Sequence, residues 1–289
     1  MHTGLCLLLM SDRECVSFLQ WALPRMGFRW PGYRKVRGQV CKRIRRRLHE
    51  LGLGNLRAYQ QYLAGHADEW QTLDGLCRIT ISRFCRDREV FRTLTTEVLP
   101  RLARQARADN LAAVEIWSAG CGAGEEPYSL TVLAEEHDDP VLSQISLHII
   151  ATDSDGYQIE RARTATYPAS CLRELSPASR RRAFERVELN SFRLRERYRT
   201  GVELRRQDLR RDMPEGPFHL ILCRNLAFTY FDTGHQREIL AGLTGNLAAG
   251  SYLVIGTHER LPPTLHSLSP SPHCPCILGP LSPRTAERD

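Results

Sequence analysis

Apolar residues follow two different spacings along this chain, and the spacing changes near residue 95. Between Asp12 and Leu99 they recur at helical intervals, in segments bounded by capping and helix-breaking residues. From Val114 onward, short apolar runs alternate with helical segments, which is the pattern of a parallel sheet with crossover helices. We therefore predict an α/β protein in which residues 1–95 form a small all-α domain and residues 96–289 form a second domain around a parallel sheet.

The first domain is expected to contain short helices only. Pro31-Gly32 interrupts the chain after the first helix, and Pro100 closes the last one. The expected helices cover residues 12–25, 34–48, 56–64, 67–76 and 87–99.

Four apolar runs of the second domain end in polar residues. They end at Ser118, at Asp153, at Asp208 and at Arg224-Asn225. Because ligands of open α/β sheets sit at the carboxyl ends of the strands, we expect these ends to meet in one crevice.

Two further stretches of the second domain stand out. Residues 168–200 are too long for a plain connection between a strand and a helix, so they are a candidate for a small inserted subdomain. The tail 265–289 is rich in proline, and we expect a hairpin around Cys276–Leu278 followed by a disordered end.

The run that ends at Ser118 is followed by three glycines and two acids: Gly120, Gly122, Gly124, Glu125 and Glu126. Glycine lets the backbone approach a ligand closely. The carboxylates repel phosphate and attract a cation, and S-adenosylmethionine is a nucleotide-like ligand with both an ammonium and a sulfonium group. The alternative is the ordinary strand–loop–helix turn of a Rossmann-like dinucleotide fold.

Asp153 lies at the tip of the second run, roughly 30 residues past the glycines, where such folds place an acid on the ribose hydroxyls. The alternative is that Asp153 or Asp155 caps the next helix.

The composition of the chain limits the class of protein and the compartment in which we expect it. The chain has 289 residues, a net charge of +7 and no apolar run of the length that spans a bilayer. Leu5–Met10 is short and follows no basic residue, which does not fit a signal peptide. The ten cysteines are scattered without a CxxC pair, which favours free thiols in the cytoplasm.

The positive charge is concentrated between Arg34 and Arg47, where eight basic residues and no acid occur. Val36, Val40 and Ile44 recur every four residues, so this stretch is predicted to be an amphipathic helix with a basic face. Its interpretations are a solvated face, a docking site for an acidic protein surface, and, least favoured because no aromatic platform accompanies it, a nucleic-acid site.

With these motifs in hand, the chain resembles the CheR family of chemotaxis receptor methyltransferases from about Asp12 to Pro263. The family's WSAGCSxGEEPYS, ATDID, CRNVxIYF, GxSE and NxTxFFR motifs correspond to residues 117–129, 151–155, 223–231, 256–259 and 80–86. The resemblance implies a Rossmann-like S-adenosylmethionine-dependent methyltransferase domain after a small all-α domain. It also implies methyl transfer to glutamate side chains of chemoreceptors. If that holds, the charge of the basic helix 34–48 suggests an acidic region of the receptor's cytoplasmic domain as its partner.

The resemblance also implies roles for individual residues. Thr80, Ser82 and Arg86 would touch the methionine end of the cofactor, and Glu125 or Glu126 its ammonium group. Asp153 would hold the ribose, and Asp208 and Leu209 would flank the adenine. Arg224 and Asn225 would line the crevice for methyl transfer, with Arg86, Arg224 and Tyr230 as the catalytic residues. A further arginine of the family corresponds to Arg101 or Arg104.

Some questions remain open at this stage. Arg86 is expected in the helical domain and Arg224 in the other. The alternatives to receptor methylation are a related methyltransferase with another substrate, and a non-catalytic S-adenosylmethionine-binding signalling module. His273, Cys274 and Cys276 are three possible metal ligands in a proline-rich tail, and we expect no metal site there.

Overall fold

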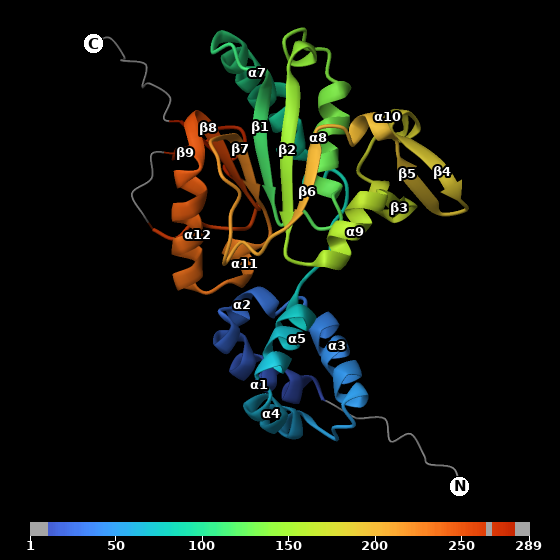
Figure 1. Ribbon diagram of the computed structural model, residues 1–289, viewed down its shortest axis with the longest axis vertical. Helices are drawn as coiled ribbons and strands as arrows, with labels where there is room; N and C mark the ends of the chain where they lie inside the picture. Colours follow the sequence, from blue (N-terminus) through green and yellow to red (C-terminus); the bar gives the residue numbers. More distant parts are fainter. Residues whose placement is uncertain (1–10, 264–267, 281–289) are drawn as a thin grey trace. The chain divides into compact units, whose positions relative to one another are not determined.

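A computed structural model describes residues 11–263 and 268–280 (Figure 1). Contacts divide the chain into two compact units. The helical unit ends at Ile79 and also includes Thr229–His235, whereas the sheet unit holds Thr80–Phe228 and the chain from Gln236 onward. The division that the sequence suggested, after residue 95, thus falls at a different place, because residues 80–95 contact the sheet unit.

The helical unit consists of short helices that bury their apolar faces on one another. Ser11 opens the first helix with a capping box, in which its hydroxyl accepts from the Glu14 N–H and the Glu14 carboxylate accepts from the Ser11 N–H. The helices are α1 (Asp12–Ala22), the 3-10 turn η1 (Leu23–Met26), α2 (Trp30–Tyr33), α3 (Arg37–Glu50), α4 (Leu56–Gly65) and α5 (Ala67–Cys77).

The break expected at Pro31-Gly32 lies earlier. Pro31 stands in the first turn of α2, where its missing N–H leaves no hydrogen bond unmade. The chain turns instead at Gly27, which has a φ of 74°.

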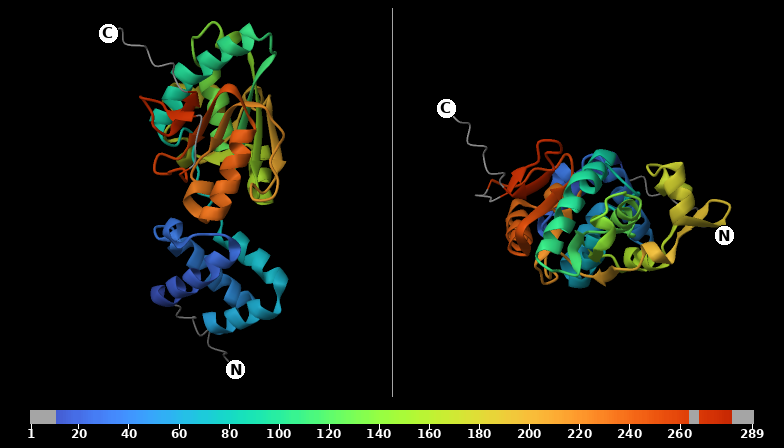
Figure 2. Two further views of the ribbon diagram at one scale, coloured as in Figure 1. Left: turned by 90° about the vertical axis from the view of Figure 1, so that its left-hand side faces the viewer. Right: turned by 90° about the horizontal axis from the view of Figure 1, so that it is seen from above.

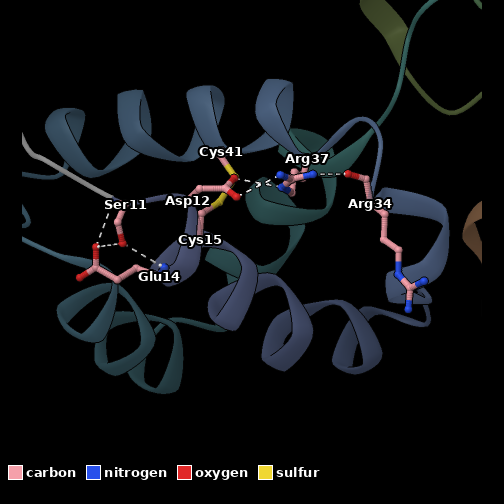
Figure 3. Close-up of a disulfide and its surroundings, with 7 residues drawn as sticks. All are labelled: Ser11, Asp12, Glu14, Cys15, Arg34, Arg37 and Cys41. Carbon is pink, nitrogen blue, oxygen red and sulfur yellow. Dashed lines mark hydrogen bonds and ion pairs between the residues drawn. A yellow bond between two sulfur atoms is a disulfide. The ribbon is translucent and has the colours of Figure 1, made fainter.

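A disulfide joins Cys15 of α1 to Cys41 of α3, so the expectation of free thiols is wrong for this pair. The two residues are 26 positions apart and become neighbours only because α1 packs on α3. Beside the bridge, the Arg37 guanidinium donates two hydrogen bonds to the Asp12 carboxylate, at 2.9 and 3.0 Å (Figure 3). The disulfide and this ion pair both tie α3 to α1.

The segment Thr229–His235 belongs to the helical unit although it follows the sheet strands in sequence. A β-bridge pairs Phe28 with Phe231, and the Asp232 N–H donates to the Gly27 carbonyl at 2.8 Å. The rings of Tyr33 and Tyr230 meet edge to face with their centroids 5.1 Å apart. Tyr230 is therefore held by residues of the helical unit.

The sheet unit begins with a helical segment that runs past Pro100, contrary to the expected stop. Pro100 falls in the first turn of a helix, after a π-helical turn. This segment comprises α6 (Arg88–Thr93), the π-turn η2 (Leu94–Val98) and α7 (Leu99–Ala108).

The core of the sheet unit is a seven-stranded sheet in the order β6-β2-β1-β7-β8-β10-β9. Strands β6, β2, β1, β7 and β8 are parallel, and β10 and β9 continue the sheet antiparallel. The strands are β1 (Ala113–Ala119), β2 (Ser146–Asp153), β6 (Val202–Arg206), β7 (Phe218–Cys223), β8 (Leu247–Ile255), β9 (Leu268–Pro270) and β10 (Ile277–Pro280). Every residue of β7 is buried, as its continuous apolar run predicts for a central parallel strand.

The connections between these strands are mostly helical. They comprise α8 (Glu125–Glu135), the 3-10 turn η3 (Leu142–Gln144), α9 (Gly156–Thr164), α11 (Ala227–Tyr230) and α12 (Thr233–Gly245). This architecture confirms the α/β fold class. The hairpin expected around Cys276 is the β9–β10 pair. The short apolar segment Leu5–Met10 and residues 281–289, where a disordered end was expected, lie outside the described residues.

A separate three-stranded sheet, in the order β3-β5-β4, stands between α9 and β6 in sequence. Its yellow segments extend beyond the β6 edge of the larger sheet (Figure 2). Its elements are β3 (Thr166–Pro168), the 3-10 turn η4 (Ala169–Leu172), α10 (Pro177–Ala183), β4 (Phe184–Glu188), β5 (Ser191–Leu194) and the 3-10 turn η5 (Glu196–Tyr198). None of the helices in the described part of the chain has the length and apolar character needed to cross a bilayer.

Candidate functional site

The glycine loop folds over the carboxyl end of β2. The N–H groups of Gly120 and Cys121 both donate to the Thr152 carbonyl, at 2.8 and 2.9 Å. Gly120, Gly122 and Gly124 have φ values of 80°, 58° and 87°, a region that side chains disfavour. The loop therefore needs its glycines and exposes backbone next to the strand ends.

Asp153 binds the same loop. One carboxylate oxygen accepts from the Gly122 N–H at 2.9 Å, and the other accepts from the Asp155 N–H at 2.8 Å. Asp155, not Asp153, caps α9, because its side chain accepts from the Tyr157 N–H. Asp153 is therefore not the helix cap, and its carboxylate lies against the glycine loop.

The two acids at the start of α8 have different surroundings. The Glu126 carboxylate accepts from the Ser118 hydroxyl at 2.8 Å and from the Arg224 guanidinium at 3.0 Å. Glu125 is only 2 % exposed, and its Oε2 has no hydrogen-bond partner. A Cβ placed on Gly122 would lie 3.7 Å from that oxygen and 3.7 Å from the Ser82 side chain.

Burial raises the pKa of the Glu125 carboxyl above its usual value, although backbone hydrogen bonding, the Arg161 charge and the Ser82 hydroxyl act against the shift. A buried carboxylate oxygen without a partner, beside a glycine loop, suits a ligand ammonium group. The residues present therefore fit the methionine end of S-adenosylmethionine. Of the two acids, Glu126 is hydrogen-bonded at both carboxylate oxygens, whereas Glu125 has one oxygen without a partner.

Arg224 follows β7 and is the hub of a buried ion-pair network. Its guanidinium donates to Glu126 at 3.0 Å, to the Asp87 carboxylate at 2.8 Å and to the Arg86 carbonyl at 2.8 Å. Its side chain is only 2 % exposed and stacks over the Phe91 ring at 5.3 Å. Arg86 and Arg224 thus lie in the same unit, which corrects the expectation that they belong to different domains.

The segment 80–87 enters the sheet unit and packs beside the glycine loop. The Cys85 N–H donates to the Ser129 hydroxyl of α8 at 2.8 Å, and Phe84 packs edge to face against Tyr167 and Phe184. Thr80, Ser82 and Arg86 are half-buried, and the Arg86 guanidinium donates to the Ile81 carbonyl at 3.1 Å.

The end of β6 lies beside Asp153, because the Gln207 N–H donates to the Asp153 carbonyl at 3.1 Å. Leu209 is buried and Asp208 is partly buried. The Asp208 carboxylate accepts two hydrogen bonds from the Arg210 guanidinium, at 3.0 and 2.7 Å. Asp208 and Leu209 thus follow the strand next to Asp153, and Arg210 is a neighbour that the sequence did not single out.

Asn225 has a φ of 56°, and its N–H donates to the Glu259 carboxylate at 2.8 Å. Asp87, with a φ of 64°, and Ser118 also hold this site together, although sequence reasoning gave no role to either. Asp87 directly follows Arg86 in the sequence, but the sequence gives no sign that its partner is 137 residues away.

The remaining candidates have other partners among the described residues. Tyr230 packs in the helical unit. Arg104 pairs at 3.4 Å with Asp139, in the connection that enters the amino end of β2, and Arg101 is exposed on the same helix. The Cys274 and Cys276 sulfurs are 3.2 Å apart, and among the described residues no group of three or more His, Cys, Asp or Glu could hold a metal ion.

Comparison with known proteins matches residues 80–273 to the family model described as the CheR methyltransferase, SAM binding domain. The probable chemotaxis protein methyltransferase of Rhizobium etli is 34 % identical over 230 residues, which covers 77 % of this chain and 84 % of the relative. The chemotaxis protein methyltransferase of Listeria innocua is 32 % identical over 187 residues, covering 64 % of this chain and 67 % of that protein. Chemotaxis protein methyltransferase 1 of Pseudomonas aeruginosa is 33 % identical over 180 residues, covering 61 % and 64 %.

Proposed function

Because this chain belongs to the CheR family of S-adenosylmethionine-dependent methyltransferases, we propose that it transfers methyl groups to glutamate side-chain carboxylates of chemoreceptors. The family match carries this proposal, since residues 80–273 include the glycine loop and the ends of β1, β2, β6 and β7. The buried acid Glu125 supports the cofactor part of the proposal independently of the match.

The cofactor contacts that we propose follow the strand ends. Glu125 receives the ammonium group, and Thr80, Ser82 and Arg86 lie along the methionine moiety. Asp153 accepts from the ribose hydroxyls, and Asp208 and Leu209 flank the adenine. Gly120, Gly122 and Gly124 provide the backbone surface against which the ligand lies. We assign Glu126 an indirect role, because its carboxylate oxygens already accept hydrogen bonds from Ser118 and Arg224.

To activate the acceptor carboxylate, the protein needs to orient it and does not need a general base. S-Adenosylmethionine supplies an electrophilic methyl group, and a glutamate carboxylate is already ionised at neutral pH. The protein therefore has to exclude water and align the carboxylate oxygen with the methyl carbon, which is worth roughly 7–11 kcal/mol in well-oriented reactions. We assign the grip on the incoming carboxylate to Arg86, and we retain Tyr230 as an active-site residue from its motif.

Arg224 has a different proposed role. Its guanidinium is committed to Glu126, Asp87 and the Arg86 carbonyl, and it is almost fully buried. We therefore propose that Arg224 positions Arg86 and the start of α8, and that Asn225 shapes the crevice through its backbone.

We further propose that α3 meets an acidic region of the receptor's cytoplasmic domain, which places the reaction in the cytoplasm. Not every cation of this stretch is available for docking. Arg37 pairs with Asp12, Arg47 binds the buried Glu69 at 2.7 Å, and Arg43 donates to the carbonyls of Leu76 and Arg78. The cations that the fold leaves exposed are Arg34 and Lys35, just before α3, and Lys42, Arg45 and Arg46 on it, of which Arg46 also pairs with Glu50 at 3.6 Å. These residues form the proposed docking surface.

The direct test incubates the protein with S-adenosylmethionine labelled in the methyl group and purified cytoplasmic fragments of chemoreceptors. We expect label in the fragments, released by mild alkali as from a carboxyl ester. Total lysate and small carboxylic acids serve as competing acceptors. Labelling of another lysate protein but not of the fragments would contradict the receptor assignment, and binding of cofactor without transfer to any acceptor would contradict the enzyme assignment.

A further inference from the structure

We propose that Glu259 is a positioning residue for the cofactor crevice, because it holds the turn Arg224–Leu226 after β7 in a strained conformation. This inference rests on the proposed function, since that turn borders the glycine loop and α8. Glu259 is only 8 % exposed, and it lies in the chain beyond β8, 34 residues after the turn that it holds.

One oxygen of Glu259 joins two backbone segments. Its Oε2 accepts from the Asn225 N–H at 2.8 Å and from the Gly256 N–H at 2.7 Å. The carboxylate therefore links the ends of β7 and β8, which are neighbouring strands of the sheet.

The turn needs this support because Asn225 has a φ of 56°, in the left-handed region that non-glycine residues enter at a cost. Gly256 leaves room for the arrangement. A Cβ at that position would lie 2.5 Å from the Asn225 side-chain nitrogen and 2.8 Å from the Glu259 oxygen. Asn225, Gly256 and Glu259 thus fit together as one unit.

The turn Arg224–Leu226 contacts two elements of the proposed cofactor site, the glycine loop and the start of α8. Leu226 packs on Gly120 so closely that a Cβ there would lie 2.5 Å from its Cδ2. Arg224 binds Glu126 at the start of α8. If the Asn225 backbone relaxes, both contacts shift, and with them the glycine loop and the helix that carries Glu125. Glu259 therefore controls cofactor binding without touching the cofactor.

The two hydrogen bonds require a side chain at position 259 that is long enough and that ends in an acceptor oxygen. Two substitutions distinguish these requirements from a requirement for negative charge. Glu259→Gln keeps the length and an acceptor oxygen but removes the charge. Glu259→Asp keeps the charge but is one methylene shorter, so it cannot span both N–H groups. Glu238→Asp makes the same change at an exposed position of α12 and serves as the control.

The measurement is calorimetric titration with S-adenosylhomocysteine, together with amide hydrogen exchange at Asn225 in the protein without cofactor. We expect Glu259→Gln and the control to bind within about threefold of wild type, and Glu259→Asp to bind at least about tenfold more weakly, the scale of one lost hydrogen bond. Exchange at Asn225 should accelerate in Glu259→Asp only. The opposite order of Gln and Asp, or unchanged affinity in Glu259→Asp, would overturn the proposal.

A second background keeps the test decisive if Glu259→Asp folds poorly. Glycine adopts a φ of 56° without strain, so Asn225→Gly makes the turn less dependent on Glu259. In that background Glu259→Asp should cost less than about threefold in affinity relative to Asn225→Gly alone. A Glu259→Asp protein that folds only with Asn225→Gly also supports the proposal, whereas equal losses in both backgrounds contradict it. Wild-type protein that binds no S-adenosylhomocysteine would instead contradict the proposed cofactor site.

Discussion

Glu125 and Glu126 are neighbours in the sequence with separate partners in the fold. Glu126 accepts from Ser118 and Arg224, whereas Glu125 is buried with one oxygen that has no partner. The sequence predicts that an acid at this position meets a cation, but it cannot say which of the two. That choice depends on Arg224, which lies 98 residues away and reaches Glu126 only in the folded chain.

The raised pKa of Glu125 predicts a proton linkage to cofactor binding. In the protein without ligand, burial favours the protonated acid, so stability decreases as the pH rises from 4.5 through the raised pKa. A ligand ammonium favours the ionised acid, so affinity for S-adenosylhomocysteine should increase across the same window, with release of a proton. Calorimetry in buffers of different ionisation enthalpy measures that proton. Glu125→Gln should lose the linkage, and an unchanged pH profile in this variant would assign the linkage to another group.

Arg224→Ala should reduce stability as well as turnover. It leaves the Glu126 and Asp87 carboxylates without their cation, and breaking a buried pair in this way costs about 3–5 kcal/mol. Arg211→Ala, at an exposed position of the same unit, should cost less than about 0.5 kcal/mol. Urea unfolding measures both. Equal stability of the two variants would show that the network is not a structural support.

Among the helices and strands, periodic patterns predicted most positions correctly. The runs that end at Ser118, Asp153 and Cys223 are strands of one parallel sheet. The errors come from local context. Pro31 and Pro100 suggested helix ends, but both fall in the first turn of a helix, where proline is tolerated. The Cys15–Cys41 pairing depends on the packing of α1 on α3, which residue spacing does not reveal.

Removal of this disulfide should destabilise the helical unit. It closes a loop of 26 residues, for which chain entropy gives about 3.5 kcal/mol at 25 °C. We expect Cys15→Ser with Cys41→Ser to lower the melting temperature of the unit, and reductant to lower that of wild type but not of the double variant. Mass spectrometry after alkylation of free thiols checks that Cys15 and Cys41 are joined in the wild-type protein that is melted. An unshifted melting temperature would contradict a stabilising bridge.

Charge reversal on the proposed docking surface should slow receptor association. Lys35, Lys42 and Arg45 are exposed, so replacing them with Glu removes long-range attraction and flattens the salt dependence of the association rate. Arg13, Arg57 and Arg237, also exposed, provide a control with the same change in net charge. Stopped-flow measurement of receptor binding compares the two. If both triple variants slow association equally, the net charge of the protein and not this particular surface determines the association rate.

At the scale of the whole molecule, sequence patterns predicted an all-α part followed by an α/β part. They did not predict which segments of the chain belong to which unit. Residues 80–95 contact the sheet unit, and Thr229–His235 pack in the helical unit. Both facts follow from long-range contacts, such as those of Phe84 with Tyr167 and of Phe28 with Phe231. The helical unit thus carries Tyr230, and the family match begins at Thr80, where the sheet unit begins.

We propose that this protein esterifies receptor glutamates with the methyl group of a cofactor held by Glu125 and Asp153. The most direct test is single-turnover transfer to a purified receptor fragment, with the modified residue located by peptide mass mapping. We predict an alkali-labile methyl ester on a glutamate side chain, formed by wild type and at least about tenfold more slowly by Asp153→Ala, roughly 1.4 kcal/mol, at a subsaturating cofactor concentration. Methyl groups found only on nitrogen or on a small molecule, or equal rates for wild type and Asp153→Ala, would contradict the account.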